Sequence, residues 1–113
     1  GCDISAYQQL TYNLFLADEV HKRGLSIGLK NDLAQIKDLE PYFDFAVNEE
    51  CHKDKKCNYL NQFIYNNKPV FHTEYEDIYK NNTNGARDRL CQDAYVFGFS
   101  TLVLSDLLDD SFR

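Results

Sequence analysis

Short apolar runs that stop abruptly at polar residues are the feature that most constrains the fold of this chain. Residues 26–29 lead directly into Lys-Asn-Asp at 30–32, and residues 45–47 lead directly into Asn-Glu-Glu at 48–50. A strand that is buried on both faces of a parallel sheet has such a continuous apolar sequence. In α/β barrels, functional side chains follow strands of this kind at their carboxyl ends. The pattern therefore predicts a parallel sheet whose strand tips carry binding or reactive groups.

Helical patterns alternate with these strands along the whole chain. The periodicity predicts helices over about residues 7–23, 58–65 and 85–97, and a short helix that begins after Asn31 or Asp32. It predicts strands over about residues 25–29, 44–48, 69–75 and 99–104, with surface loops over 51–56 and 76–84. Such alternation is typical of a parallel sheet with right-handed crossovers. We therefore expect four consecutive αβ units in one partial domain over residues 1–113. A small open α/β sheet that folds alone is the alternative.

The first helix carries the signals for both of its ends. Ser5 is a suitable N-cap, and Gly24 is suitable for the turn that ends the helix. Apolar side chains recur every three or four residues between them, at Ala6, Leu10, Leu14, Ala17 and Val20. This stripe predicts a helix that packs one face against the rest of the domain.

Length and charge narrow the classes of protein to which the chain can belong. A complete eight-stranded α/β barrel needs about 250 residues, so the 113 residues here suffice for about half of one. The net charge of −6 argues against nucleic-acid binding, which needs a basic surface, and is compatible with a cationic substrate. No apolar run approaches the roughly 20 residues that span a bilayer, so we expect no membrane partner.

The four cysteines, Cys2, Cys51, Cys57 and Cys91, allow three disulfide pairings. An even number in a small chain favours an oxidising compartment, and four reduced, buried thiols are the alternative. A zinc site at Cys51, His52 and Cys57 is not expected, because the Cys-x5-Cys spacing is wider than that of the usual zinc sites. The chain also lacks a phosphate-binding loop and a dinucleotide fingerprint. We therefore expect neither a metal nor a cofactor.

Glu49 is the strongest candidate for a catalytic residue. It follows an apolar run, and partial desolvation at such a place raises the pKa of a carboxyl group and suits a general acid near neutral pH. Lys30 and Asn31, at the preceding strand tip, can bind polar groups of a ligand or hold a carboxylate ionised. The alternative for Lys30 is an ion pair with Glu49 or Asp32 that only stabilises the fold. Asp32 itself is expected to cap the next helix.

Other polar residues near the strand ends are weaker candidates. Asn48 can orient the catalytic candidate, whereas Glu50 is expected to point to the other side. Tyr75 offers an aromatic ring for stacking, and Glu74 offers a carboxylate for a cationic group. Asp106 follows the fourth strand and is the weakest of these candidates. We expect Asn48, Glu74 and Tyr75 to lie near one another at the strand ends.

Several of these segments carry a resemblance to a known enzyme family. They are GLSIGLKNDL at residues 24–33, DFAVNEEC at 44–51, CNYL at 57–60, KPVFHTEY at 68–75 and GFSTLVLSDLLDD at 98–110. In this order and spacing they resemble the C-terminal half of glycoside hydrolase family 114, the endo-α-1,4-polygalactosaminidase group, whose fold is a TIM barrel. The resemblance implies that the four αβ units correspond to the second half of a (β/α)8 TIM barrel.

The resemblance also implies roles for individual residues. It places the catalytic acid/base on Glu49. The second carboxylate of the family, an Asp on an earlier strand, would precede Gly1, so the isolated chain is expected to be incomplete as an enzyme. The residues expected to line the sugar cleft are Lys30, Asn31, Asn48, Glu74 and Tyr75.

The resemblance further implies a secreted protein that acts on a cationic galactosamine polysaccharide. It favours a disulfide between Cys51 and Cys57, which leaves Cys2 to pair with Cys91. A glycosylation sequon at Asn81 is a second extracellular signal. The rival hypotheses are a non-catalytic carbohydrate-binding half barrel and a truncated half barrel without function. Because a half barrel has unpaired sheet edges, we expect either a homodimer or pairing with the missing N-terminal half.

Overall fold

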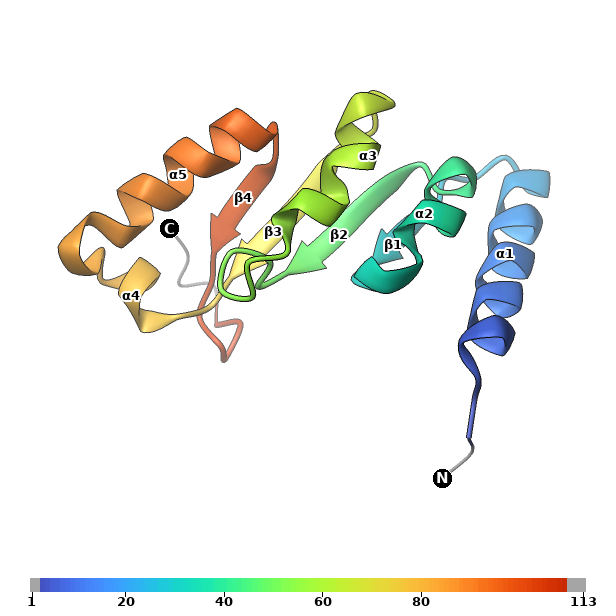
Figure 1. The fold of residues 1–113 in the computed structure, drawn as a ribbon, viewed down its shortest axis with the longest axis horizontal. Helices are drawn as coiled ribbons and strands as arrows, with labels where there is room; N and C mark the ends of the chain where they lie inside the picture. Colours follow the sequence, from blue (N-terminus) through green and yellow to red (C-terminus); the bar gives the residue numbers. More distant parts are fainter. Residues whose placement is uncertain (1–2, 110–113) are drawn as a thin grey trace.

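The computed structural model describes residues 3–109, which form one parallel sheet with helices packed on it (Figure 1). The strand order follows the chain, β1-β2-β3-β4, and all three neighbouring pairs are parallel. The strands are β1 (Gly28–Lys30), β2 (Phe45–Glu49), β3 (Val70–Glu74) and β4 (Ser100–Val103). The predicted α/β fold with four consecutive αβ units is therefore confirmed. The arrangement is consistent with half of an eight-stranded barrel.

The helices between the strands are mostly short. They are α1 (Ala6–Lys22), α2 (Ile36–Leu39), α3 (Asn61–Tyr65), α4 (Asp77–Lys80) and α5 (Ala86–Phe97), with 3₁₀ turns η1 (Leu33–Gln35), η2 (Glu40–Tyr42), η3 (Cys57–Leu60) and η4 (Thr83–Gly85). The loop predicted over residues 76–84 is wrong in part, because α4 and η4 lie within it. An ion pair of 2.8 Å between Lys80 and Asp77, one turn apart, supports the short helix α4.

Both ends of α1 are capped as the sequence predicts. The Ser5 hydroxyl accepts a hydrogen bond from the backbone N–H of Gln8, whose side chain in turn accepts one from the backbone N–H of Ser5. At the other end, Gly24 has a positive φ of 71° and donates to the carbonyl of His21. Neither α1 nor any other helix within residues 3–109 is long and apolar enough to cross a membrane.

The helices cover one face of the sheet. In Figure 1, α2 and α3 lie over the strands, while α1 and α5 lie beyond β1 and β4. On this face, Leu29, Ala46 and Val70 point from three adjacent strands into a core with helix residues such as Leu39 and Phe63. Burial alternates along β2 and β3, as expected of strands with one covered face. We call this side the covered face.

The opposite side, which we call the open face, carries several apolar side chains. The rings of Phe45 and Phe71 meet edge to face with centroids 5.9 Å apart. Phe71 and Leu102 remain about half exposed, because none of the helices packs over them. Gly28 lies against the Phe45 ring so closely that an added Cβ would stand 2.3 Å from a ring carbon. Glycine is therefore the residue that lets the Phe45 ring lie across β1.

Replacing Phe63 by Ala tests the position of the core. The Phe63 side chain is fully buried, so its loss should lower the free energy of unfolding by about 3–5 kcal/mol. Phe15→Ala is the matched control, because Phe15 lies on the outer side of α1 with 57% of its surface exposed, and should change stability by about 0.5 kcal/mol or less. Urea denaturation measures both, and equal losses in the two variants would contradict this core.

Candidate active site

The chain turns sharply after β1 and after β2. Asn31 and Asp32 follow β1 with φ of 53° and 49°, and Glu50 follows β2 with φ of 57°. This left-handed conformation is uncommon for residues other than glycine and clusters at functional sites. Backbone hydrogen bonds hold both turns, since the N–H of Asn31 donates to Val47 and that of Glu50 donates to Thr73. The polar side chains at these tips are thereby fixed relative to the sheet.

The Glu49 carboxylate is the centre of a hydrogen-bonded cluster on the open face. Its Oε2 accepts from the Lys30 ammonium at 2.6 Å and from the Asn31 amide at 3.2 Å. Its Oε1 accepts from the Tyr75 hydroxyl at 2.7 Å, and the Tyr75 oxygen accepts in turn from the Thr73 hydroxyl at 3.3 Å. Three residues predicted for the site, from the ends of β1 and β3, thus meet at the carboxylate at the end of β2.

Asn31 contacts both the side chain and the backbone of Glu49. While its amide nitrogen donates to the carboxylate, its oxygen accepts from the Glu49 N–H at 2.9 Å and from the Asn48 amide at 3.2 Å. A single side chain therefore ties the tip of β1 to that of β2. Asn48 is 1% exposed and lies under the helices, so it does not reach the Glu49 carboxylate itself. It acts on Glu49 through its hydrogen bond to Asn31.

These contacts keep Glu49 ionised. They lower the pKa of Glu49 from 4.5 to about 2, chiefly through the Lys30 hydrogen bond and then through the Tyr75 hydrogen bond. Burial acts in the opposite direction but is the smaller effect, since about a third of the side chain remains exposed. The predicted rise of the Glu49 pKa is therefore wrong in this structure. The other prediction, that Lys30 and Asn31 hold a carboxylate ionised, agrees with the contacts.

Glu74 does not lie with the other predicted site residues. It is fully buried on the covered face, where Oε1 accepts from the backbone N–H of His52 at 2.8 Å and lies 3.2 Å from Nε2 of His72. Successive side chains of a strand point to opposite faces. Glu74 therefore points away from the face that carries Glu49 and Tyr75, and the prediction that it lines the same cleft does not agree with this placement.

The loop that follows β2 is closed by a disulfide between Cys51 and Cys57, as the family resemblance implies. The ligand atoms of both cysteines and of His72 lie within 4.8 Å of one another. A disulfide sulfur is not a thiolate, so this group is not a metal site while the bond is intact. Cys91 is exposed on α5 and has no disulfide partner among residues 3–109, and Cys2 lies outside the described residues.

The remaining acidic candidates lie around the cluster. Asp32 stands at the N-cap position of η1, as predicted, but its side chain makes no capping hydrogen bond and accepts one from Asn13 of α1 at 3.4 Å instead. Glu50 forms an ion pair of 2.7 Å with Lys53. Asp106 is exposed and lies 3.9 Å from Lys80.

An acidic hollow of about 390 Å³ lies beside the Glu49 cluster. It is lined by Glu50, Lys53, Tyr75, Glu76, Asp77, Ile78 and Asp106. Tyr75 belongs to both groups, since its hydroxyl reaches Glu49. Sequence reasoning missed Glu76 and Asp77 as site neighbours because they were assigned to a surface loop. Their position directly after the tip of β3 was the signal that could have identified them.

Comparison with known proteins places this geometry in a family. The model of glycoside-hydrolase family GH114 matches residues 1–113. The chain is also similar to the crystal structure of Aspergillus fumigatus Ega3 in complex with galactosamine, with 30% sequence identity and a TM-score of 0.83. That match covers 100% of this chain and 47% of the Ega3 chain, so this chain spans about half the length of Ega3. A comparison with curated protein sequences found no match.

Removing the Lys30 ammonium tests the electrostatics of Glu49. In Lys30→Ala, the pKa of Glu49 should rise from about 2 toward 4.5, because the largest stabilising contact of the carboxylate is lost. The unaltered chain should lose the stability that this contact supplies as the pH falls from about 4.5 to about 2, and Lys30→Ala should lose less over that range.

The carboxyl carbon shift of Glu49, followed by NMR over this pH range, measures the change. Lys53→Ala is the control, because Lys53 pairs with Glu50 and should leave the Glu49 pKa where it is. An unchanged Glu49 pKa in Lys30→Ala would contradict the assigned cause.

Proposed function

Since the chain belongs to glycoside-hydrolase family GH114, we propose that it supplies the acid/base half of an active site that hydrolyses α-1,4-linked galactosamine polysaccharide. The observation that carries the proposal is the Glu49 carboxylate at the carboxyl end of β2, held by Lys30, Asn31 and Tyr75. Carboxyl ends of strands are where α/β barrels carry their catalytic groups. Two carboxylates on either side of the scissile bond are the usual requirement for glycoside hydrolysis.

Glu49 is the proposed acid/base of this reaction. It starts ionised, takes up a proton from solvent water once the Lys30 ammonium has moved away from Oε2, and donates that proton to the glycosidic oxygen, which leaves as a hydroxyl group when its bond to the anomeric carbon breaks. Asn31 keeps the carboxylate in place during this exchange, because it also holds the Glu49 backbone. Asn48 supports Asn31 from the covered face.

Charge around the cluster supports an amino sugar as the substrate. Free amines of polymeric galactosamine are cationic near neutral pH, and four carboxylates line the hollow beside Tyr75. The chain as a whole carries a net charge of −6. The Tyr75 ring adds a surface for the apolar face of a sugar. The similar structure of Ega3 was determined with galactosamine bound.

The second carboxylate is proposed to come from outside this chain. Among residues 3–109, the Glu49 carboxylate accepts hydrogen bonds from a lysine, an amide and a phenol, and it is hydrogen-bonded to no other carboxyl group. The match to about half of Ega3 supports four further αβ units that would complete the barrel and supply the missing Asp. A second copy of this chain is the alternative source. The disulfide between Cys51 and Cys57 supports a secreted protein.

A non-catalytic carbohydrate-binding domain is the second candidate function. The low pKa of Glu49 favours it, because a carboxylate held by a lysine and a tyrosine is also what a binding site for polar groups needs. Binding of galactosamine oligomers without product formation, weakened in Glu49→Gln, would support this candidate over the enzyme.

Replacing Glu49 by Gln tests the catalytic assignment. In the protein that contains the complete barrel, Glu49→Gln should reduce hydrolysis of α-1,4-linked galactosamine oligomers by about 10²-fold or more, because Gln cannot exchange a proton. Products are detected by mass spectrometry. Glu19→Gln is the matched control, since Glu19 pairs with Arg23 on α1, lies outside both the Glu49 cluster and the acidic hollow, and should retain most of the activity. Substantial hydrolysis by Glu49→Gln would rule out Glu49 as the acid/base.

A further inference from the structure

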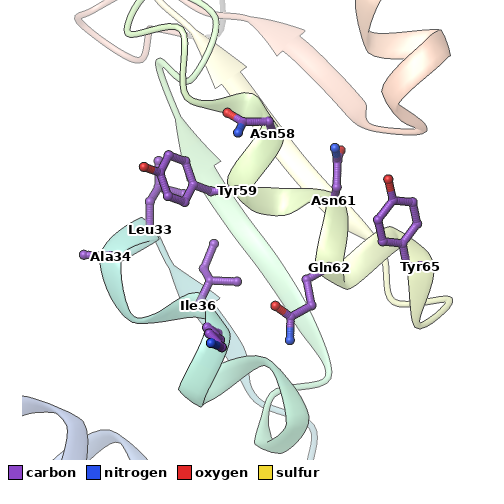
Figure 2. A pocket seen from close by; sticks show the side chains of 9 residues that line it. Leu33, Ala34, Ile36, Asn58, Tyr59, Asn61, Gln62 and Tyr65 are labelled. Carbon is purple, nitrogen blue, oxygen red and sulfur yellow. The ribbon is translucent and has the colours of Figure 1, made fainter.

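We propose that the groove between α2 and the η3–α3 segment is a second carbohydrate-binding site, one that takes an uncharged oligosaccharide. We call it the outer groove (Figure 2). Its volume of about 680 Å³ lies within the roughly 300–1,000 Å³ of typical small-molecule sites. It lies on the covered side of the sheet, whereas Glu49 is on the open face, so it is separate from the candidate active site.

The outer groove combines apolar and aromatic surface. Leu33, Ala34 and Ile36 come from the η1–α2 segment, and Tyr59 and Tyr65 come from the η3–α3 segment (Figure 2). Both tyrosines are largely exposed, at 51% and 79%. An exposed phenol ring presents a flat apolar surface with a polar end, which suits the mixed faces of a pyranose ring. The apolar side chains suit methyl groups such as those of N-acetyl substituents.

The polar groups of the outer groove suit hydroxyl and amide groups. The Asn58 and Asn61 side chains make no hydrogen bond to another part of residues 3–109, so their donors and acceptors are free for a ligand. Gln62 donates to the buried Glu40 at 3.1 Å, which fixes its orientation in the groove wall. Amides both donate and accept hydrogen bonds, as sugar hydroxyl groups do. A purely apolar protein surface would leave the sugar hydroxyl groups unpaired.

The charge of the outer groove indicates which class of oligosaccharide it suits. The outer groove contains no carboxylate and one cation, Lys37, on a chain whose net charge is −6. A polymer with many free amines lacks a counter-charge here, and a polyanion meets a single lysine. The groove therefore differs from the acidic hollow beside Tyr75, which contains four carboxylates. An uncharged, N-acetylated oligosaccharide of the same sugar fits the outer groove, and this choice of sugar rests on the proposed function.

The wall that carries Tyr59 is held in place before any ligand binds. Asn58 and Tyr59 directly follow Cys57, whose disulfide to Cys51 ties η3 to the end of β2. Leu60 and Phe63 are buried at 1% and 0% exposure and anchor the other side of the same segment in the core. A preformed wall lowers the entropy lost on binding.

Calorimetric titration of this chain with a fully N-acetylated, α-1,4-linked galactosamine tetramer tests the proposal. Tyr59→Ala should weaken binding about tenfold or more, and Asn58→Ala, a second exposed change in the same wall, should also weaken it. Tyr95→Ala is the matched control, because Tyr95 is 88% exposed on α5 and outside the groove, and should bind as the unaltered chain does. Circular dichroism checks that the variants are folded.

Glu49→Gln separates this proposal from the proposed function, since binding in the outer groove should be unchanged by it. Binding lost in Glu49→Gln and retained in Tyr59→Ala would place the sugar at the candidate active site and overturn the outer groove. No saturable binding by the unaltered chain would also overturn it. Tighter binding of the deacetylated tetramer that depends on Tyr59 would overturn the assignment of an uncharged ligand.

Discussion

Burial of only one face of a parallel sheet is the constraint on which the rest of this structure depends. Side chains alternate along each strand, so one set enters the core and the other set faces away from the helices. On β2, Ala46 and Asn48 enter the core, and Glu49 faces away. On β3, His72 and Glu74 are buried, and Thr73 faces away toward Tyr75. A shift of one residue in either strand would exchange the two sets.

The open face carries apolar side chains next to the charged cluster. Phe45, Phe71 and Leu102 are among its apolar residues, and Leu102 pairs with Thr73, which in turn pairs with Glu49. An apolar layer next to a charged cluster lowers the local dielectric and strengthens hydrogen bonds to the carboxylate. The apolar layer also explains why Gly28 is needed at the start of β1, since the Phe45 ring occupies the space of a side chain there.

The sequence predicted much of the fold because its signals are local. Ser5 and Gly24 cap α1 where expected, and every strand was found within a few residues, because apolar runs and turn residues mark the ends. The placements that failed depend on nonlocal geometry. Glu74 ends an apolar run as Glu49 does, yet the pleat places it on the opposite face.

The charged contacts that set the pKa of Glu49 could also not be predicted from the sequence. Proximity to an apolar run predicts a raised pKa for Glu49, but the lysine and tyrosine that lower it lie 19 and 26 residues away and meet it only through the sheet register. The buried Glu40, paired with Lys68 at 2.8 Å, was missed for the same reason. Contacts between residues far apart in the sequence decide both cases, and a single sequence carries no direct signal of such contacts.

The ionised state of Glu49 limits how it can take part in hydrolysis. With a pKa of about 2, only about one carboxyl in 10⁵ carries a proton at pH 7, so the resting group is a base and not an acid. A glycosidase needs one protonated and one ionised carboxyl at the start of the reaction, or one group that fills both roles in turn.

Lys30 is the contact of Glu49 that can move, because its side chain is 53% exposed and can turn into water, whereas Asn31 is tied to the Glu49 backbone. Departure of Lys30 removes the largest cause of the low pKa, so under the proposed function a sugar group that displaces the ammonium and leaves no cation in its place lets Glu49 hold a proton.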